Sequence, residues 1–364
     1  MNRLQNKRWF QTLVLLILVF LLVLLISKTS FIFYPMSQYI GAVAIPIIGA
    51  GILFYLTKPV MHFFENKLKI HRILAILLVF LILTCLLFLF ILYIFPIAQH
   101  QIENLIHNIP KMVTGTQNLI LSLQSNQIII PEPINDAIND FMNNIQVYVE
   151  NSVSYLFGFI THLVTLVASL FLIPFFLFFM LKDGDKLVPF ITQIFKKKKA
   201  DNIKSLLSKI DIVLTAFIQG QLIVSFFLGI LLFIGYLIIG LNYALTIALF
   251  GMLMNVIPFL GPFLAVIPAL LVAFFQDPIM VVWVAIITLI AQQVESNLIS
   301  PNVMGRVLAL HPLTVITVIL AAGSIAGFLG ILFAVPFYAV VKTIFAHIYQ
   351  TYEHSHDDKA DSLL

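Results

Sequence analysis

Charged side chains are scarce in this 364-residue chain. Asp, Glu, Lys and Arg make up 10% of the residues, whereas 61% are hydrophobic. Soluble domains carry about 25% charged residues, so this chain has too few to cover a surface that faces water. A helix over Ile73–Ala98 would have no polar face at all. The composition excludes an ordinary soluble protein and predicts an all-α polytopic protein in a lipid bilayer.

Cysteine and catalytic motifs are also nearly absent. Cys85 is the single cysteine, so no internal disulfide can form. The sequence has no His-Glu-x-x-His, no Walker loop and no Gly-x-Ser-x-Gly. We therefore predict that the chain is not an enzyme, takes no cofactor and holds no metal. Asp183-Gly184-Asp185 is too short for a calcium loop. We interpret it as a helix-ending turn with Gly184 as the C-cap, and a gating role is the alternative.

Long apolar runs are what the sequence does contain, and we expect them to cross the membrane as helices. The first is interpreted as a retained anchor, because Ser27–Ser30 has no small-x-small cleavage pattern. The runs before residue 241 are Thr12–Ile26, Phe31–Thr57, Ile73–Ala98, Ser152–Leu181 and Ile212–Gly240.

Basic residues are concentrated in alternate polar segments. Three precede the first run, four lie in Lys58–Arg72 and eight lysines lie in Lys182–Asp211. The insert Gln99–Asn151 instead has Lys111 against five acidic residues, and its apolar residues fall at helical spacing. Because cytoplasmic loops are rich in Lys and Arg, we predict a cell-membrane protein with a cytoplasmic N-terminus and a helical extracellular insert.

These features divide the chain into five parts. Residues 1–98 hold three membrane segments, and 99–151 form the insert. Residues 152–211 hold the fourth segment and a basic cytoplasmic loop. Residues 212–347 form a C-terminal membrane domain, and 348–364 form a polar tail.

The apolar segment Tyr243–Phe275 is interrupted by helix breakers. Pro258, Gly261 and Pro262 follow soon after Asn255. Proline removes a backbone donor, and the freed carbonyl groups need partners from protein or from a water-filled cavity. Broken helices of this kind commonly hold the substrate or ion in transporters. We therefore count these four residues among the candidates for a translocation site.

A second segment resembles the first. Phe259–Val266 aligns without gaps on Phe328–Val335, with five of eight residues identical. This similarity predicts a repeated broken helix, and adds Gly327 and Gly330 to the candidates. The repeat favours two re-entrant hairpins that face a central site; two independently kinked helices are the alternative. The sequence leaves open whether 243–275 and 313–345 cross once or enter and return.

Glu295 is the acidic residue of the apolar stretch Ile279–Ser300, where the polar residues Gln292, Gln293 and Asn297 surround it. A carboxylate at membrane depth costs at least a few kcal/mol, so it should face a partner, a cavity or an ion. This pattern predicts an ion or substrate site. Alternatively, Glu295 lies at headgroup level as a helix-end residue, with Arg306 as its ionic partner.

Several short motifs together resemble the AI-2E family of permeases, also called PerM-like. They are Phe178–Asp185, Gly220-Gln221, Ile257–Pro262, Gln293–Pro301, Met304-Gly305 and Leu310–Pro312. The resemblance implies seven or eight membrane segments, an oligomer, and either export of a small signalling molecule or cation–proton antiport. It also implies gating or structural roles for Asp183, Gly184, Gln221, Arg306 and His311.

Three function classes compete on this evidence. The leading one is secondary, ion-coupled transport of a small solute or ion, with the lipid bilayer and further copies of the chain as partners. The alternatives are a passive channel formed by an oligomer, and a membrane scaffold whose extracellular hairpin binds partners. We expect no nucleic acid as a partner, because Lys196–Lys199 lies beside the membrane, where anionic headgroups explain it more simply.

Overall fold

The computed structural model describes residues 8–105, 107–108, 144, 167–304 and 310–361, and every regular element within these residues is a helix. Five helical stretches are long and apolar enough to cross a membrane, and shorter apolar helices accompany them. The prediction of an all-α polytopic membrane protein is confirmed. The long stretches are Tyr34–Asn66, Arg72–Leu105, Lys197–Ile238, Pro278–Met304 and Pro312–Thr351.

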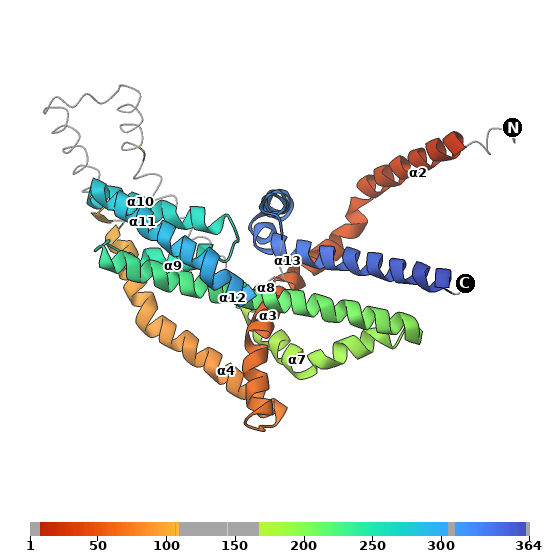
Figure 1. The fold of residues 1–364 in the computed structure, drawn as a ribbon, viewed down its shortest axis with the longest axis horizontal. Coiled ribbons are helices and arrows are strands. Elements are labelled where there is room, and N and C mark those ends of the chain that lie inside the picture. Colours follow the sequence, from red (N-terminus) through yellow and green to blue (C-terminus); the bar gives the residue numbers. More distant parts are fainter. Residues whose placement is uncertain (1–7, 106, 109–143, 145–166, 305–309, 362–364) are drawn as a thin grey trace.

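The first half of the chain forms a bundle of three helices. They are α3 (Ser30–Asn66), α4 (Arg72–Leu89) and α7 (Val167–Thr192). Ala50 of α3, Ile76 of α4 and Leu177 of α7 belong to one fully buried apolar cluster. Beyond α4 the helix continues through a π-turn, η1 (Phe90–Ile94). Helix α2 (Arg8–Lys28) projects away from this bundle (Figure 1).

The second half is organised around one long helix, α8 (Lys197–Ile238). Its Leu228, Leu232 and Tyr236 lie in a buried cluster with residues of the next three helices. These are α9 (Ala244–Met254), α10 (Gly261–Gln276) and α11 (Pro278–Val294). The chain continues through η2 (Glu295–Ile299), α12 (Ser300–Met304) and α13 (Pro312–Asp361).

The prediction that a helix ends at Asp183-Gly184-Asp185 is wrong. Helix α7 runs through this triplet to Thr192, and Gln193–Lys196 connects it to α8. Two contacts explain the continuation. Arg72 donates from Nε and Nη2 to the Leu181 carbonyl oxygen, at 3.1 and 2.7 Å, and from Nη1 to Asp185 at 2.6 Å. Gly184 lies within the helix, and a Cβ built there would meet the Phe54 ring only at ordinary contact distance, so neither a C-cap nor close packing requires glycine at this position.

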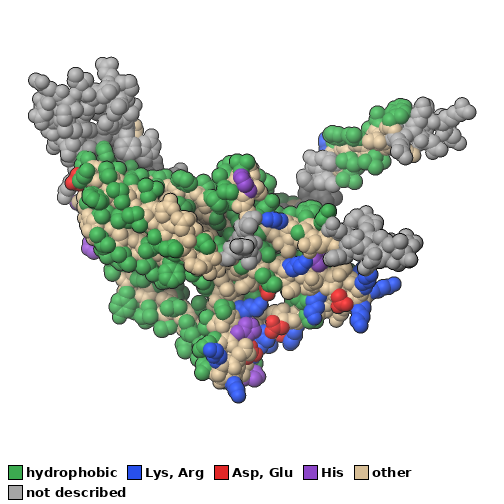
Figure 2. Space-filling view, viewed as in Figure 1, with side chains coloured by type: hydrophobic (Ala, Val, Ile, Leu, Met, Phe, Trp, Pro, Cys, Tyr) green, Lys and Arg blue, Asp and Glu red, His purple; other side chains and the backbone are tan. Residues whose placement is uncertain are grey.

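Charged side chains gather at one end of the molecule, which we call the basic end. Lys58 pairs with Asp211 at 3.3 Å, and Lys209 lies 3.3 Å from His347. These contacts join α3, the start of α8 and the last part of α13. Figure 2 shows the Lys and Arg side chains concentrated toward one side of this view, with a broad hydrophobic surface elsewhere.

The opposite end lies where the insert begins, and we call it the insert end. Thr246, in the first turn of α9, donates from its hydroxyl to Gln101 at 2.7 Å, and Tyr243 accepts a hydrogen bond from Asn108 at 3.2 Å. The predicted segregation of basic loops from the insert is therefore matched by their positions at opposite ends of α8. Most of the insert lies outside the described residues.

Candidate functional site

The first break reverses the chain between α9 and α10. Phe259 has a positive φ of 64° in the turn, and Pro262 occupies the first turn of α10, where a missing N–H costs nothing. A Cβ on Gly261 would collide with the carbonyl oxygen of Met254, seven residues earlier. In a straight helix these residues would be about 10 Å apart. The predicted breakers thus form a hairpin rather than a kinked span.

The second break lies inside α13 and also turns the chain back. Gly327 adopts φ 58° and ψ −140°, which side chains disfavour. A Cβ on Gly330 would collide with the carbonyl oxygen of Ala322. Gly261 and Gly330, which align in the sequence repeat, therefore have the same role, because each allows one helical arm to touch the carbonyl end of the other. We call residues 312–325 and 328–361 the first and second arms of α13.

The two hairpins enter from opposite ends. The first begins and finishes at the insert end, where Gln276 donates to the Gly240 carbonyl oxygen at 2.8 Å. The second arm of α13 finishes at the basic end, at His347. Helix α9 has 11 residues and is about 16 Å long, too short for a bilayer core of about 30 Å. The length of α9 therefore places the turn of the first hairpin within the depth of the membrane.

The turn of the first hairpin packs against the arms of the second hairpin beside α8. Phe217 of α8 forms one buried cluster with Ile319 from the first arm of α13 and Ala334 from the second. Leu260, from the turn of the first hairpin, packs against the same cluster. The first break is thus brought against the arms of the second hairpin, whereas the second break, at Ala326 and Gly327, lies on an exposed part of α13.

A polar network lies at the turn of the first hairpin. Asn255 is 1% exposed, and its side-chain amide meets the hydroxyl of Ser225 at 3.5 Å and the carboxyl group of Glu295. Gln221 of α8 donates to the Asn255 carbonyl oxygen at 2.5 Å. One carboxyl group, two amides and a hydroxyl therefore converge from α8, the hairpin turn and η2. We call these four residues the Glu295 site.

The local structure around Glu295 is a π-helix. Residues Glu295–Ile299 form η2 directly after α11, and such single turns occur frequently at functional sites. The wider turn presents different faces before and after Glu295. Glu295 and Gln292 are half-buried, whereas Gln293 and Asn297 are exposed and bonded to each other at 2.7 Å. The structure therefore brings Glu295 to Asn255 but leaves Gln293 and Asn297 on an outer surface.

The remaining sequence candidates have other positions. His311 accepts the Leu313 N–H at 3.3 Å and so caps α13. Asp183 pairs with Lys186 at 2.7 Å at the basic end, and this hydrogen bond holds the pKa of Asp183 below its ordinary value of 3.8. Arg306 lies outside the described residues. None of these described contacts joins the Glu295 site.

Two buried polar features were missed in the sequence. Ser225 follows Gln221 by four residues, so the pair shares one face of α8, and this spacing in an apolar run could have revealed it. The second is the Tyr236–Thr288 pair, whose oxygens lie 3.3 Å apart between α8 and α11. Gly220, which precedes Gln221, abuts the Met304 side chain, so two of the family motifs meet in space.

The chemistry available at the Glu295 site is that of a single carboxyl group with neutral oxygen and amide partners. Such a group can take up one proton, or share a cation with carbonyl oxygens. Within the described residues, no group of three or more His, Cys, Asp or Glu side chains could hold a metal ion.

A helical membrane protein with two opposed hairpins that meet beside polar groups has the architecture of membrane transport proteins. Comparison with known proteins makes the class specific: the chain belongs to the AI-2E family of transporters, whose family model matches residues 13–350. The predicted resemblance is confirmed.

Its relatives are named as transport proteins or permeases. The chain is 36% identical over 354 residues to "Putative transport protein YueF" of Bacillus subtilis (strain 168), covering 95% of this chain and 94% of that protein. It is 28% identical to "Putative transport protein YrrI" of the same strain, over 91% and 94% of the two chains. It is 26% identical to "Putative permease PerM" of Escherichia coli (strain K12), over 89% and 91%.

Proposed function

We propose that this protein is a secondary transporter that couples the movement of a small solute to a proton or monovalent cation bound at Glu295. The observation that carries the proposal is the contact between the Glu295 carboxyl group and the buried Asn255 amide at the turn of the first hairpin. A carboxylate at this depth costs at least a few kcal/mol unless it is neutralised. A bound proton or cation removes that cost.

The opposed hairpins supply the two gates of this proposal. The first hairpin closes the path from the insert end, and the second closes it from the basic end. Movement of the first hairpin carries Asn255 away from Glu295 and exposes the carboxyl group. Because an unneutralised carboxylate is unfavourable when it is buried in the closed state, the protein changes gates more readily when Glu295 is loaded. This preference couples the ion to the solute.

The side assignment follows the distribution of charge. We place the basic end and the N-terminus in the cytoplasm, and the insert outside the cell. The contact between His347 and Lys209 supports the same side for the end of α13. With this orientation, the transporter exports a small solute such as a signalling molecule, or exchanges a cation for protons.

An oligomer fits the outer surface of η2. Gln293 and Asn297 are exposed on a segment of lipid-crossing length. They bond to each other at 2.7 Å, and their remaining donors and acceptors need partners that lipid lacks. A second copy of the chain supplies them. We therefore propose a homo-oligomer with η2 at or near its interface.

The test is the coupled flux of Glu295→Gln in proteoliposomes. This change keeps the shape of the side chain and removes its charge. Glu65→Gln is the matched control, because Glu65 pairs with His62 at 3.5 Å in the first half of the chain. We expect solute counterflow to persist in Glu295→Gln while uptake driven by a proton or sodium gradient falls at least about tenfold, with Glu65→Gln unchanged.

Two results would contradict the proposal. Gradient-driven uptake by Glu295→Gln at the unaltered rate would exclude this residue from coupling. A flux that is linear in concentration and shows no counterflow in the unaltered protein would indicate a passive channel instead of a carrier.

A further inference from the structure

The start of the insert packs against the base of the first hairpin. The helical stretch Arg72–Leu105 has 34 residues and is about 51 Å long, well over a bilayer core of about 30 Å, so its last turns reach the surface at the insert end. Gln101, Leu105 and Asn108 are spaced four and three residues apart and share one partly buried face. Leu105 packs against the buried cluster of the second half. This face is therefore the one that docks on the hairpin.

One contact on this face completes helix α9. The first N–H groups of a helix have no partner inside it and are ordinarily capped by the N-cap side chain. The N-cap of α9 is Tyr243, which has φ 60° and makes no side-chain capping bond. The Gln101 side-chain oxygen caps the helix instead, because it accepts the Thr246 N–H at 3.1 Å and the Thr246 hydroxyl at 2.7 Å. The cap of α9 thus comes from the insert.

A second contact holds the same end of α9. Asn108 donates from its side-chain nitrogen to the Tyr243 hydroxyl at 3.2 Å. Gln101 and Asn108 lie seven residues apart, which is about 10 Å along the insert helix. Two contacts at this separation resist rotation of α9 as well as its displacement.

The base of the first hairpin has the features of a hinge. Gln276 donates to the Gly240 carbonyl oxygen and accepts the Asn242 N–H, both at 2.8 Å, so the end of α10 is held to the connection between α8 and α9. Within this connection Gly240 and Tyr243 both have positive φ, 69° and 60°. The angle between α8 and α9 is therefore set by side-chain contacts and not by a continuous helix. Asn255 follows the other end of α9, about 16 Å away, and moves with that angle.

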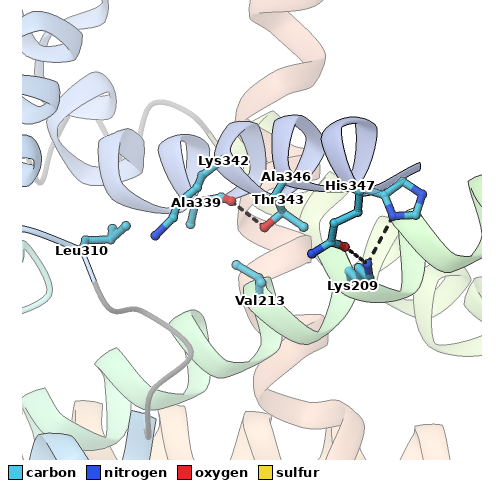
Figure 3. Close-up of a pocket in the computed structure, with 9 residues that line it drawn as sticks. Lys209, Val213, Leu310, Ala339, Lys342, Thr343, Ala346 and His347 are labelled. Carbon is cyan, nitrogen blue, oxygen red and sulfur yellow. Dashed lines mark hydrogen bonds between the residues drawn. The ribbon is translucent and has the colours of Figure 1, made fainter. Parts of the chain in front are cut away.

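The second hairpin is held differently. At the basic end, Lys209 of α8 lies 3.3 Å from His347 of the second arm (Figure 3). This contact ties the second hairpin to α8 itself. Gln101 and Asn108 instead tie the insert to the hairpin that carries Asn255.

We propose that Gln101 and Asn108 form a latch through which the insert controls the opening of the first hairpin, an inference that rests on the proposed role of this hairpin as a gate. While the latch is closed, α9 keeps its cap and Asn255 stays against Glu295. Release of the latch gives the Thr246 N–H to water and lets α9 turn at its connection to α8. A ligand that binds the insert better in the released state then favours opening.

The test measures exposure of a buried thiol on α9. After Cys85→Ala, Ala248→Cys places the thiol on the buried face of α9, and a charged, water-soluble maleimide reacts with it when α9 leaves its neighbours. The protein is held in lipid nanodiscs, where the reagent reaches both ends. Gln101→Leu removes the acceptor at similar size, whereas Gln101→Glu keeps an acceptor oxygen at a helix N-terminus, where negative charge is favourable. The control is Gln99→Leu, because Gln99 is exposed on the same helix and bonds to Glu103 within it at 2.9 Å.

We expect Gln101→Leu to raise the rate of modification at least about tenfold, which corresponds to about 1.4 kcal/mol in the opening equilibrium. Gln99→Leu and Gln101→Glu should both stay within about twofold of the rate with Gln101. Equal rates in Gln101→Leu and Gln99→Leu would overturn the latch, as would a rate in Gln101→Glu as high as in Gln101→Leu. If Gln101→Leu does not fold, Asn108→Leu replaces it.

A second reporter separates opening of the gate from general loosening. Ala75→Cys places the thiol in the buried cluster of the first bundle, and its rate should not change in Gln101→Leu. A parallel rise at both reporters would indicate partial unfolding and overturn the latch. Because thiol modification requires no transported solute, failure here is distinct from failure of the Glu295→Gln flux test.

Discussion

The bundle of α3, α4 and α7 and the helices from α8 onward are built from similar apolar residues but bury different groups. Among the described residues, the first bundle buries the polar Thr57, whose hydroxyl bonds within its own helix to Leu53. The second half buries Gln221, Ser225, Asn255 and Thr288, all bonded between elements. Its helices are also broken twice, whereas α3 continues for 37 residues.

This difference indicates that the first bundle supports the structure, whereas the second half holds the candidate site. A continuous helix satisfies its own backbone in lipid, and a broken one requires partners from its surroundings. The second half provides those partners at the turn of the first hairpin, beside Glu295. The first half instead places its ionic contacts at the basic end, where Arg72 joins α4 to α7. Changes in the two halves should therefore have different consequences.

Glycine substitutions should show the largest contrast. Gly261→Ala and Gly330→Ala each drive a methyl group into a backbone carbonyl oxygen, which cannot rotate away. We expect a loss of about 2 kcal/mol or more in stability, with little folded protein recovered. Gly51→Ala in α3 meets open space and should be neutral or slightly stabilising. Thermal unfolding in detergent measures both, and equal melting temperatures for Gly261→Ala and Gly51→Ala would contradict the hairpin geometry.

Loss of the Asn255 amide should uncouple transport rather than unfold the protein. In Asn255→Ala, the Glu295 carboxyl group loses its neutral partner, and we expect gradient-driven flux to fall about tenfold. The matched control is Thr288→Val, which removes the other buried polar contact of this half, with Tyr236. That change should cost about 1 kcal/mol of stability and leave coupling intact.

The combination of Asn255→Ala with Glu295→Gln sharpens this prediction. If the two side chains act as one unit, the double variant should have the flux of Glu295→Gln alone. Fully multiplicative losses would show that Asn255 acts independently of Glu295.

In the first half, Arg72→Gln should reduce stability without changing transport. The guanidinium group bonds both the Leu181 carbonyl oxygen and Asp185, and loss of these partly exposed contacts should cost about 1 kcal/mol. The melting temperature and the coupled flux measured on one preparation test this. A variant with normal melting but impaired coupling would remove the distinction between the two halves.

The smallest effect is expected for Asp183→Asn at the surface of α7. Because pairing with Lys186 lowers the pKa of Asp183 below 3.8 in the folded protein, the pair stabilises above that pH and is lost as the pH falls through the lowered pKa. Asp183→Asn should therefore leave melting almost unchanged at pH 7 and reduce its dependence on pH below 3.8. Altered solute flux at pH 7 would instead support the gating role considered for this residue.

Much of the fold follows from the sequence because the membrane imposes helices. The apolar runs, Pro258, Pro262 and the aligned glycines located the helices and both breaks. The reversal of the chain could not be deduced, since it depends on φ 64° at Phe259 and on which arm packs against α8. The end proposed for a helix at Gly184 was wrong because the contacts of Arg72 come from a distant segment.

The sequence predicted which residues belong to the candidate site but not which of them contact one another. Glu295 and Asn255 were both included, and Gln221 was assigned a gating or structural role; the structure bonds it to the Asn255 backbone. Gln293 and Asn297 were included for their proximity to Glu295 in sequence, and the π-turn leaves them on the outer surface.

The contact between the turn of the first hairpin and the second hairpin is the central claim, and cross-linking within one chain tests it most directly. After Cys85→Ala, Leu260→Cys is combined with Ile331→Cys, since both positions pack against the cluster beside Phe217. The control combines Leu260→Cys with Gln350→Cys at the basic end. With a short bis-maleimide in membranes, we predict a linked peptide for 260 and 331 and none for 260 and 350. Failure of the first pair, or equal linkage of both, would contradict the account.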